Sequence, residues 1–267
     1  MSSMHRLRRT TEYIDKIRPD YHLVPYRVLI MTSPNSTNQK DPRQALIEAG
    51  VEVFGKYGYD GATTRQIART AGVNLAAIPY YFGGKEELYR ATVQWIVDSL
   101  RDNVREQIGS WVDTLDYDAM NAEELVEAAI HILLSFTACI ERKDSAGVKL
   151  IITREQIMPT TSFPVVHEGL REPLFVILGR IVGKLMRCDP DDPEVIIRIH
   201  ALISQATFFS VGRTSLQINL NTDNLEREHI EIIAKVIEQN SRAILSQWIR
   251  RDQDQGREVK EFSDVSA

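Results

Sequence analysis

The sequence predicts an all-α fold, and three observations carry that prediction. Apolar residues recur at intervals of three and four through successive segments, helix caps and turn residues separate these segments, and no segment alternates like a half-buried strand. The 267 residues suit one large or two modest domains. Hydrophobic residues at 43% and charged residues at 26% are typical of a folded globular chain, which excludes wholesale disorder.

The chain is predicted to divide into four parts. A basic, flexible arm over 1–40 precedes a helix-turn-helix domain over 41–90, a larger helical domain over 91–251 and a flexible tail over 252–267. The arm carries seven Lys and Arg against three Asp and Glu, a balance that suits the minor groove of DNA. The alternative is a start-site artefact, because Met31 immediately precedes a polar run.

The first helix of the 41–90 segment begins at Pro42, since proline suits a first helical turn. Gly55 and Gly58 mark the end of its apolar face. Thr63 and Gln66 then fit a capping box, in which the hydroxyl caps the Gln amide while the Gln side chain reaches back. A second helix is therefore predicted to start directly after Thr63.

Two further helices complete this segment. Gly72 turns the chain, and Asn74 is a good N-cap for a short helix through about Phe82. Lys85 opens a long amphipathic helix through about Ile108. The rest of the chain, interrupted at 158–164 and 188–193, predicts helices over roughly 121–141, 147–157, 169–187, 193–211 and 225–251.

Composition also bounds the location and the cofactors. No run of about 18 uninterrupted apolar residues exists, so neither a membrane-spanning helix nor a membrane partner is predicted. The N-terminus lacks a secretory signal, which makes the cytoplasm the expected location. Cys139 and Cys188 are too few for a disulfide framework or a four-ligand zinc site, and no cofactor is predicted. The net charge of −5 argues against indiscriminate coating of nucleic acid but permits a local DNA-binding surface.

The turn at Ala71-Gly72-Val73 joins two short helices, as in a helix-turn-helix. In that arrangement the first helix braces the DNA backbone and the second enters the major groove. A helical hairpin that only packs would use the same residues. The order of residues over 41–90 resembles the TetR/AcrR family of bacterial transcriptional regulators, through Ala49, Phe54, Gly58, Thr63, Ile67-Ala68, Ala71-Gly72-Val73, Tyr81-Phe82 and Lys85-Glu86-x-Leu88.

A second match extends this resemblance into the C-terminal part. Residues 76–83, together with Arg154-Glu155 and Pro159-Thr160, are similar to the CecR subfamily. The resemblance implies a ligand-responsive regulator that binds palindromic, double-stranded operator DNA as a homodimer; repression is the commoner direction in the family, and activation is the alternative. A small-molecule effector in the second domain would relieve DNA binding. Carried over by position, the DNA-binding residues are Thr63, Arg65, Leu75, Ala76, Ala77, Pro79, Tyr80, Tyr81 and Lys85.

Each DNA contact has its own physical test. Arg65 is the best direct reader, because a planar guanidinium can grip guanine bidentately. Helix capping alone would explain Thr63, and Tyr80 could pack instead of contacting phosphate. Tyr81 and Lys85 are expected at phosphates. The helix at 75–79 offers no side-chain donor, so we expect it to read thymine methyls and groove shape, and Pro79 should distort its last turn.

The last two long helices are the expected dimer elements. The helix at 193–211 is apolar almost all round, so it must be covered on more than one side. A four-helix junction across a two-fold axis fits, and burial within one monomer is the alternative. The predicted interface residues are Ile199, Ile203, Phe208, Ile233, Ile237, Ile244 and Trp248.

The middle helices are expected to form the effector pocket. Its apolar walls would be Trp95, Phe136, Cys139, Phe163, Phe175 and Phe208, and its polar groups His131, Arg154, Gln156, His167, His200 and Gln205. Each histidine could equally be structural. Effector binding would shift the long helix that starts near Lys85 and change the spacing of the two recognition helices.

Two other classes of protein compete with a DNA-binding regulator. An enzyme is disfavoured, because the chain lacks GxSxG, GxGxxG, a phosphate-binding Gly-rich Lys loop and HExxH. A helical adaptor would use the hairpin to bind protein. Salt-dependent DNA binding separates the adaptor from the regulator, because phosphate contacts release counterions.

Overall fold

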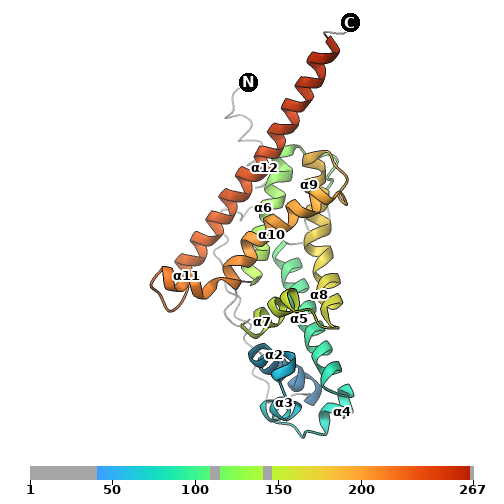
Figure 1. The fold of residues 1–267 in the computed structure, drawn as a ribbon, viewed down its shortest axis with the longest axis vertical. Helices are drawn as coiled ribbons and strands as arrows, with labels where there is room; N and C mark the ends of the chain where they lie inside the picture. The colour runs from blue at the N-terminus through green and yellow to red at the C-terminus, as the bar shows by residue number, and fades with distance from the viewer. Residues whose placement is uncertain (1–40, 109–114, 141–145, 265–267) are drawn as a thin grey trace. The chain divides into compact units, whose positions relative to one another are not determined.

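The structure is a computed structural model that describes residues 41–108, 115–140 and 146–264, without the side chains of 107, 171–173 and 250–264. Within these residues every regular element is a helix and no strand occurs, so the all-α prediction is confirmed (Figure 1). The predicted arm at 1–40 lies outside the described residues.

The described chain divides into two compact units. The helix-turn-helix unit takes in 41–104, 139–140 and 146–173, and the helical unit takes in 105–108, 115–138 and 174–264. The predicted boundary between residues 90 and 91 falls inside a helix. Residues 139–140 and 146–173, which the sequence placed in the second domain, lie in the helix-turn-helix unit. Its helices are α2 (Pro42–Gly61), α3 (Thr64–Ala71), α4 (Ala77–Phe82), most of α5 (Lys85–Ile108), α7 (Ala146–Ile157) and α8 (Phe163–Leu170).

Local signals set the ends of α2 and α3. The Asp41 carboxylate accepts a hydrogen bond from the Arg43 amide at 3.1 Å, and Pro42 occupies the first turn. The backbone of α2 breaks at Gly58, whose φ of 73° favours glycine. The predicted capping box of α3 is present: Thr63 Oγ1 accepts from the Gln66 amide at 3.2 Å, while Gln66 Oε1 accepts from the Thr63 amide at 2.8 Å.

The start of α4 differs from the sequence prediction. The helix begins at Ala77, and Asn74 caps the preceding turn by accepting from the Ala76 amide at 2.9 Å. Pro79 is therefore the third helical residue, where a missing N–H leaves no intrahelical bond unmade. The expected distortion of the last turn is wrong, because the Gly83 amide still donates to the Pro79 carbonyl at 3.0 Å.

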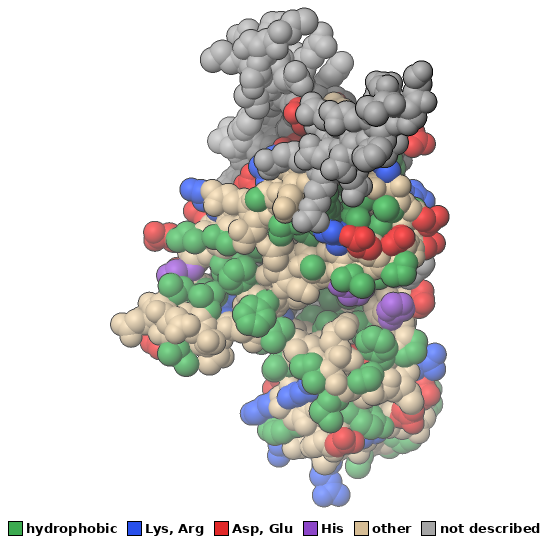
Figure 2. Space-filling view, turned by 45° about the horizontal axis from the view of Figure 1, so that its top comes forward, with side chains coloured by type: hydrophobic (Ala, Val, Ile, Leu, Met, Phe, Trp, Pro, Cys, Tyr) green, Lys and Arg blue, Asp and Glu red, His purple; other side chains and the backbone are tan. Residues whose placement is uncertain are grey.

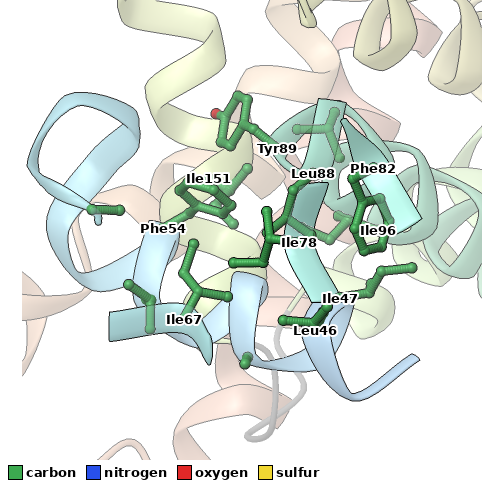
Figure 3. Packing of buried hydrophobic residues seen from close by; sticks show 14 of the residues in the cluster. Leu46, Ile47, Phe54, Ile67, Ile78, Phe82, Leu88, Tyr89, Ile96 and Ile151 are labelled. Atoms are coloured by element: carbon green, nitrogen blue, oxygen red, sulfur yellow. The ribbon is translucent and has the colours of Figure 1, made fainter. Parts of the chain in front are cut away.

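One hydrophobic core holds the helix-turn-helix unit together. Side chains from α2, α3, α4, α5 and α7 point toward one another in Figure 3. Full burial of one such aliphatic side chain contributes about 1.5–3 kcal/mol. Because α7 supplies Ile151 and α8 supplies Val166, these two helices are part of this core; its most deeply buried members include Leu46, Phe54, Ile67, Ile78, Leu88, Ile96, Ile151 and Val166.

The helical unit follows most of the predicted boundaries. Its elements are most of α6 (Ala122–Ile140) and of the π-helical turn η4 (Arg171–Val176), then α9 (Ile177–Met186), α10 (Pro193–Val211), α11 (Arg213–Asn219) and α12 (Arg227–Asp264). Three predictions differ from the structure. The helix α11 was not predicted, and α8 begins within the segment 158–164 that was predicted to interrupt the helices. The last helix was predicted to end near residue 251, whereas α12 continues to Asp264. A charge pair ties α12 to α6, where the Arg242 guanidinium contacts both carboxylate oxygens of Glu127.

Of the helices in the described residues, α10 is the one with enough length and apolar composition to cross a bilayer. Core helices of soluble proteins meet the same criteria, so this is a weak indication. Much of the apolar surface of α10 is used within the unit, because it packs against α9 and α12 with Val195, Ile199, Leu202 and Ala206 buried.

Candidate nucleic-acid interface

The residues predicted to contact DNA bases lie on the outer side of α3, α4 and the turn between these helices. Arg65, Ala76 and Pro79 are exposed, and Ala77 is half-buried. Leu75 is also exposed, although a leucine side chain is usually buried. The opposite sides of these short helices face the core through Ile67, Ala68, Ile78 and Phe82. An open groove of about 510 Å³ runs beside α4, lined by Pro42, Val73, Asn74, Ala76, Ala77, Tyr80 and Tyr81.

Thr63 and Arg65 both lie near the start of α3. The Thr63 hydroxyl is engaged in capping, since it accepts from the Gln66 amide and donates to Gln66 Oε1 at 2.8 Å. Its capping role is thus present, and a phosphate contact would be additional. Arg65 is exposed in the first turn, where its guanidinium can reach a base edge.

The two tyrosines form an exposed aromatic pair. Tyr80 is 82% exposed, which rules out the alternative that it packs into the core. Its ring meets that of Tyr81 edge-on, with centroids 4.8 Å apart. Two phenol hydroxyls on α4 are donors of the kind that contact DNA phosphates.

Lys85 lies at the start of α5 and is already partly engaged. Its Nζ sits 4.6 Å from the centroid of the Tyr59 ring and donates to the Asp60 carbonyl at 3.4 Å. An ammonium group has three donors, so the others can still reach a phosphate. Burial, followed by the charges of Glu86 and Asp60, raises the pKa of Tyr59, which keeps its ring neutral beside the lysine.

Two exposed cations were missed by the sequence analysis. Arg43 stands in the first turn of α2 with its guanidinium carbon 5.3 Å from the Phe82 ring centroid, and Arg69 is exposed in the last turn of α3. The sequence signal for Arg43 is its position directly after Pro42, at the predicted start of a helix. The structure adds that this helix start lies next to Phe82 of α4. In Figure 2, Lys and Arg side chains project from the lower end of the visible face.

Arg154 was predicted in the effector pocket; it belongs to α7, and its guanidinium contacts the backbone of α2. Its Nη1 donates to the carbonyls of Phe54 at 3.0 Å and Gly55 at 2.6 Å. These carbonyls lie one turn before the break at Gly58, where regular helical donors are lost. The guanidinium therefore caps a helix end instead of facing a ligand.

The neighbouring Glu155 is buried and fully engaged. It accepts from the Tyr89 hydroxyl at 2.6 Å and from the Thr160 amide and hydroxyl at 3.1 and 2.8 Å. Burial, reinforced by this hydrogen bond, raises the pKa of Tyr89 above its ordinary range, so the phenol remains a donor.

The other pocket candidates are divided between the two units. In the helix-turn-helix unit Trp95 is half-buried and Gln156 is exposed, while the rings of Phe163 and His167 lie 6.1 Å apart. Cys139 is buried. Within this unit, the structure thus pairs Phe163 with His167.

In the helical unit, Phe136 is buried and the rings of Phe175 and His200 lie 4.7 Å apart. The Nε2 atoms of His131 and Gln205 are buried without a hydrogen-bond partner in the described residues. His131 nevertheless makes another interaction. The effector pocket stays a prediction, and within the described residues no three His, Cys, Asp or Glu side chains gather as metal ligands do.

The predicted dimer residues need correction. Ile199, Ile203, Ile233, Ile237 and Trp248 are buried within the chain, which leaves little of their surface for a partner to contact. Ile244 is half-buried and only Phe208 is exposed, because the deepest apolar stripes of α10 and α12 pack inside the unit. Other apolar side chains remain exposed instead, as over the corner of α10 and α11 in Figure 2: Ile196, Ile197, Phe208, Val211, Ile218, Leu220, Ile232 and Val236.

Comparisons with known proteins agree with this architecture. Residues 46–92 match the family described as bacterial regulatory proteins, tetR family, and residues 122–247 match the C-terminal domain of the HTH-type transcriptional dual regulator CecR. The chain is 31% identical to the HTH-type transcriptional dual regulator CecR of Shigella flexneri over 208 residues, which covers 78% of this chain and 93% of that protein.

Two solved structures share the fold at low identity. A TetR-like transcriptional regulator from Rhodococcus sp. RHA1 is 14% identical with a TM-score of 0.55, over 79% of this chain and 99% of that one. AibR, in a complex with isovaleryl coenzyme A and operator DNA, is 14% identical with a TM-score of 0.52, over 74% of this chain and 96% of that one.

Proposed function

Because this chain belongs to the TetR family of bacterial transcriptional regulators, with a C-terminal domain of the CecR type, we propose that it binds a palindromic operator as a homodimer and releases it when a small molecule occupies its helical domain. It is a transcriptional regulator and not an enzyme, as are its relatives. It acts in the cytoplasm, where its operator lies.

The exposed side of α3 and α4 is the observation that supports DNA binding most directly. Its polar ends carry Arg65 and Tyr80, and its middle is the short apolar surface from Leu75 to Pro79. An apolar helix face can contact thymine methyl groups, while an arginine next to it reads guanine. Arg43, Tyr81 and Lys85 would then hold phosphates on either side.

The exposed apolar side chains of α10 and α12 support dimerisation. Ile197 and Phe208 on α10 and Ile232 on α12 are each more than half exposed. Isolated exposed apolar residues are common, but a run of them on neighbouring helices marks an interaction surface. A second copy of the chain is the occupant, because a two-fold pair doubles the readout of an operator.

Ligand control is proposed from the family and not from a cavity. AibR has been solved with a ligand and operator DNA together, so a protein of this fold can hold both. We propose repression as the direction of control, with a coupling of about 1–3 kcal/mol that weakens operator binding roughly 5- to 150-fold.

The test is selection of duplexes from a randomised pool by the full chain, followed by binding to the DNA upstream of its own gene at increasing salt. We expect enrichment of a palindrome and a loss of affinity with salt, with a slope of about −0.9 per phosphate contact. A chain that enriches no sequence, or whose binding ignores salt, is an adaptor and not a regulator. Scrambled duplex of equal length is the control.

A further inference from the structure

Within the helix-turn-helix unit, the backbones of α2 and α7 touch. A Cβ atom built on Gly55 would lie 2.7 Å from Gly147 Cα, and one built on Gly147 would lie 2.6 Å from the Val51 carbonyl oxygen. Only glycine permits two helices to cross at this separation. The position of α7 relative to α2 is therefore fixed by backbone contact before any side chain is considered.

From this crossing, a series of contacts leads along α7 to the start of α5. Glu155 on α7 accepts from the Tyr89 hydroxyl at 2.6 Å, and the Tyr89 ring lies 5.1 Å from that of Tyr59. The ring of Tyr59 in turn carries the Lys85 ammonium at 4.6 Å. Tyr89 also lies one helical turn after Lys85 on α5, so both side chains share one face of that helix.

A second, shorter link joins the same two places. The Thr161 hydroxyl, in the turn between α7 and α8, lies 3.1 Å from Glu86 Oε1 in the first turn of α5. Glu155 holds the preceding Thr160 by its amide and its hydroxyl. The first link starts on α7 and the second in the turn after it, and both lead to the end of α5 that carries Lys85.

The Glu155 carboxylate does more than fill space in the core, because it accepts hydrogen bonds from Tyr89 and Thr160. It is 1% exposed, and a buried carboxylate is costly unless hydrogen bonds satisfy it. An apolar residue of similar size would leave the Tyr89 hydroxyl and the Thr160 amide without their acceptor. A carboxylate, unlike an apolar group, fixes the direction of the Tyr89 hydroxyl and the path of the turn at Thr160.

We propose that Glu155 is a positioning residue for operator binding: by holding Tyr89 and Thr160 it fixes the first turn of α5 and thereby places the Lys85 ammonium for its phosphate. The proposal rests on the proposed function and deepens it. A movement of the α7–α8 turn that releases Glu155 would free Lys85 from its position and weaken DNA binding without altering α3 or α4.

The experiment measures binding to a duplex that the unmodified chain selects from a randomised pool. Its central comparison is a cycle of four full-length proteins: the unmodified chain, Glu155→Gln, Lys85→Ala and the double variant; two further variants complete it. The Gln side chain keeps its size but turns one acceptor into a donor, which opposes the donors of Tyr89 and Thr160. Tyr89→Phe removes the same hydrogen bond from the other side. Asp98→Asn on α5 is the matched control, because it makes the same chemical change in a partly exposed ion pair.

We expect Glu155→Gln and Tyr89→Phe to bind the duplex about fivefold more weakly, and the salt slope to fall by about 0.9 per lost phosphate contact. In the Lys85→Ala background, Glu155→Gln should cost nothing further. Circular dichroism and thermal melting establish that each variant is folded.

Three results distinguish the outcomes. If the unmodified chain selects no duplex, the proposed function fails. If it selects one and Glu155→Gln binds with unchanged affinity and salt slope, the positioning role is refuted. If the losses from Glu155→Gln and Lys85→Ala simply add, Glu155 acts on stability alone, and the positioning role is again refuted.

Discussion

The two units of this chain differ in how well the sequence predicted which side chains are exposed to solvent. In the helix-turn-helix unit, most of the residues expected to face DNA are exposed, among them Arg65, Leu75 and Tyr80, and the others are half-buried. In the helical unit, five of seven residues expected at the dimer interface are buried inside the chain. Short helices between fixed caps have one possible inner side, whereas a long helix that is apolar all round has several.

The structural details of α3 and α10 make this difference concrete. A capping box begins α3 and Gly72, with a φ of 68°, ends it, so eight residues have little freedom of rotation. In contrast, α10 runs for 19 residues with apolar side chains on every face. The sequence of α10 indicates that several neighbours cover it. It does not show which of its apolar faces packs against the other helices of the same unit.

The largest expected effect comes from comparing a buried apolar side chain of α12 with an exposed one of α10. Ile237→Ala should lower the free energy of unfolding by about 2–5 kcal/mol, because it opens a cavity in the helical unit. Phe208→Glu should leave the free energy of unfolding of the monomer within about 0.5 kcal/mol and instead weaken dimerisation. Denaturant titration and sedimentation velocity measure the two quantities.

The matched control for the dimer surface is Ile157→Glu. Ile157 and Phe208 are both 70% exposed, but Ile157 lies on α7 in the other unit. A dimer that survives Phe208→Glu, or that Ile157→Glu disrupts equally, would contradict the assignment of the interface to the exposed side of α10.

The next effect concerns the crossing of α2 and α7. Gly147→Val should cost about 3 kcal/mol, since its Cβ would press on the Val51 carbonyl, a backbone atom that cannot rotate away. Gly84→Ala is the control, because apart from the adjoining backbone no atom lies within 4 Å of the added methyl group. Equal thermal midpoints for the two variants would show that α7 does not need this close approach.

The smallest effect is on sequence preference. Arg65→Ala should lose about 1–2 kcal/mol of discrimination between the selected duplex and a scrambled one, with stability unchanged, because the guanidinium is exposed. Fluorescence anisotropy with both duplexes measures the ratio of affinities. A ratio that stays the same in the variant removes Arg65 from the readout.

Sequence reasoning succeeded where the signal was local. The capping box at Thr63, the turn at Gly72 and the helical periods of α5 and α10 each depend on residues within a few positions of one another. The resemblance singled out Arg154 and Glu155 but could not assign their contacts. Arg154 meets Phe54, a hundred positions away, and no short-range pattern encodes that distance.

The errors share this physical origin. The brief α11 and the π-helical turn were not predicted, and Asn74 caps a turn because α4 begins two residues later than an N-cap at Asn74 would place it. The predicted dimer residues show the same limit. They were recognised as apolar, but the sequence did not show that most of them pack inside their own unit.

The inclusion of α7 and α8 in the core of the helix-turn-helix unit has a practical consequence for protein engineering. Chimeras between related regulators are naturally cut after the last helix of the sequence motif, near residue 90. A graft cut there would separate Ile151 and Arg154 from the α2 groups that they cover and cap. A transplanted DNA-binding module should therefore carry residues 146–173 from the same parent.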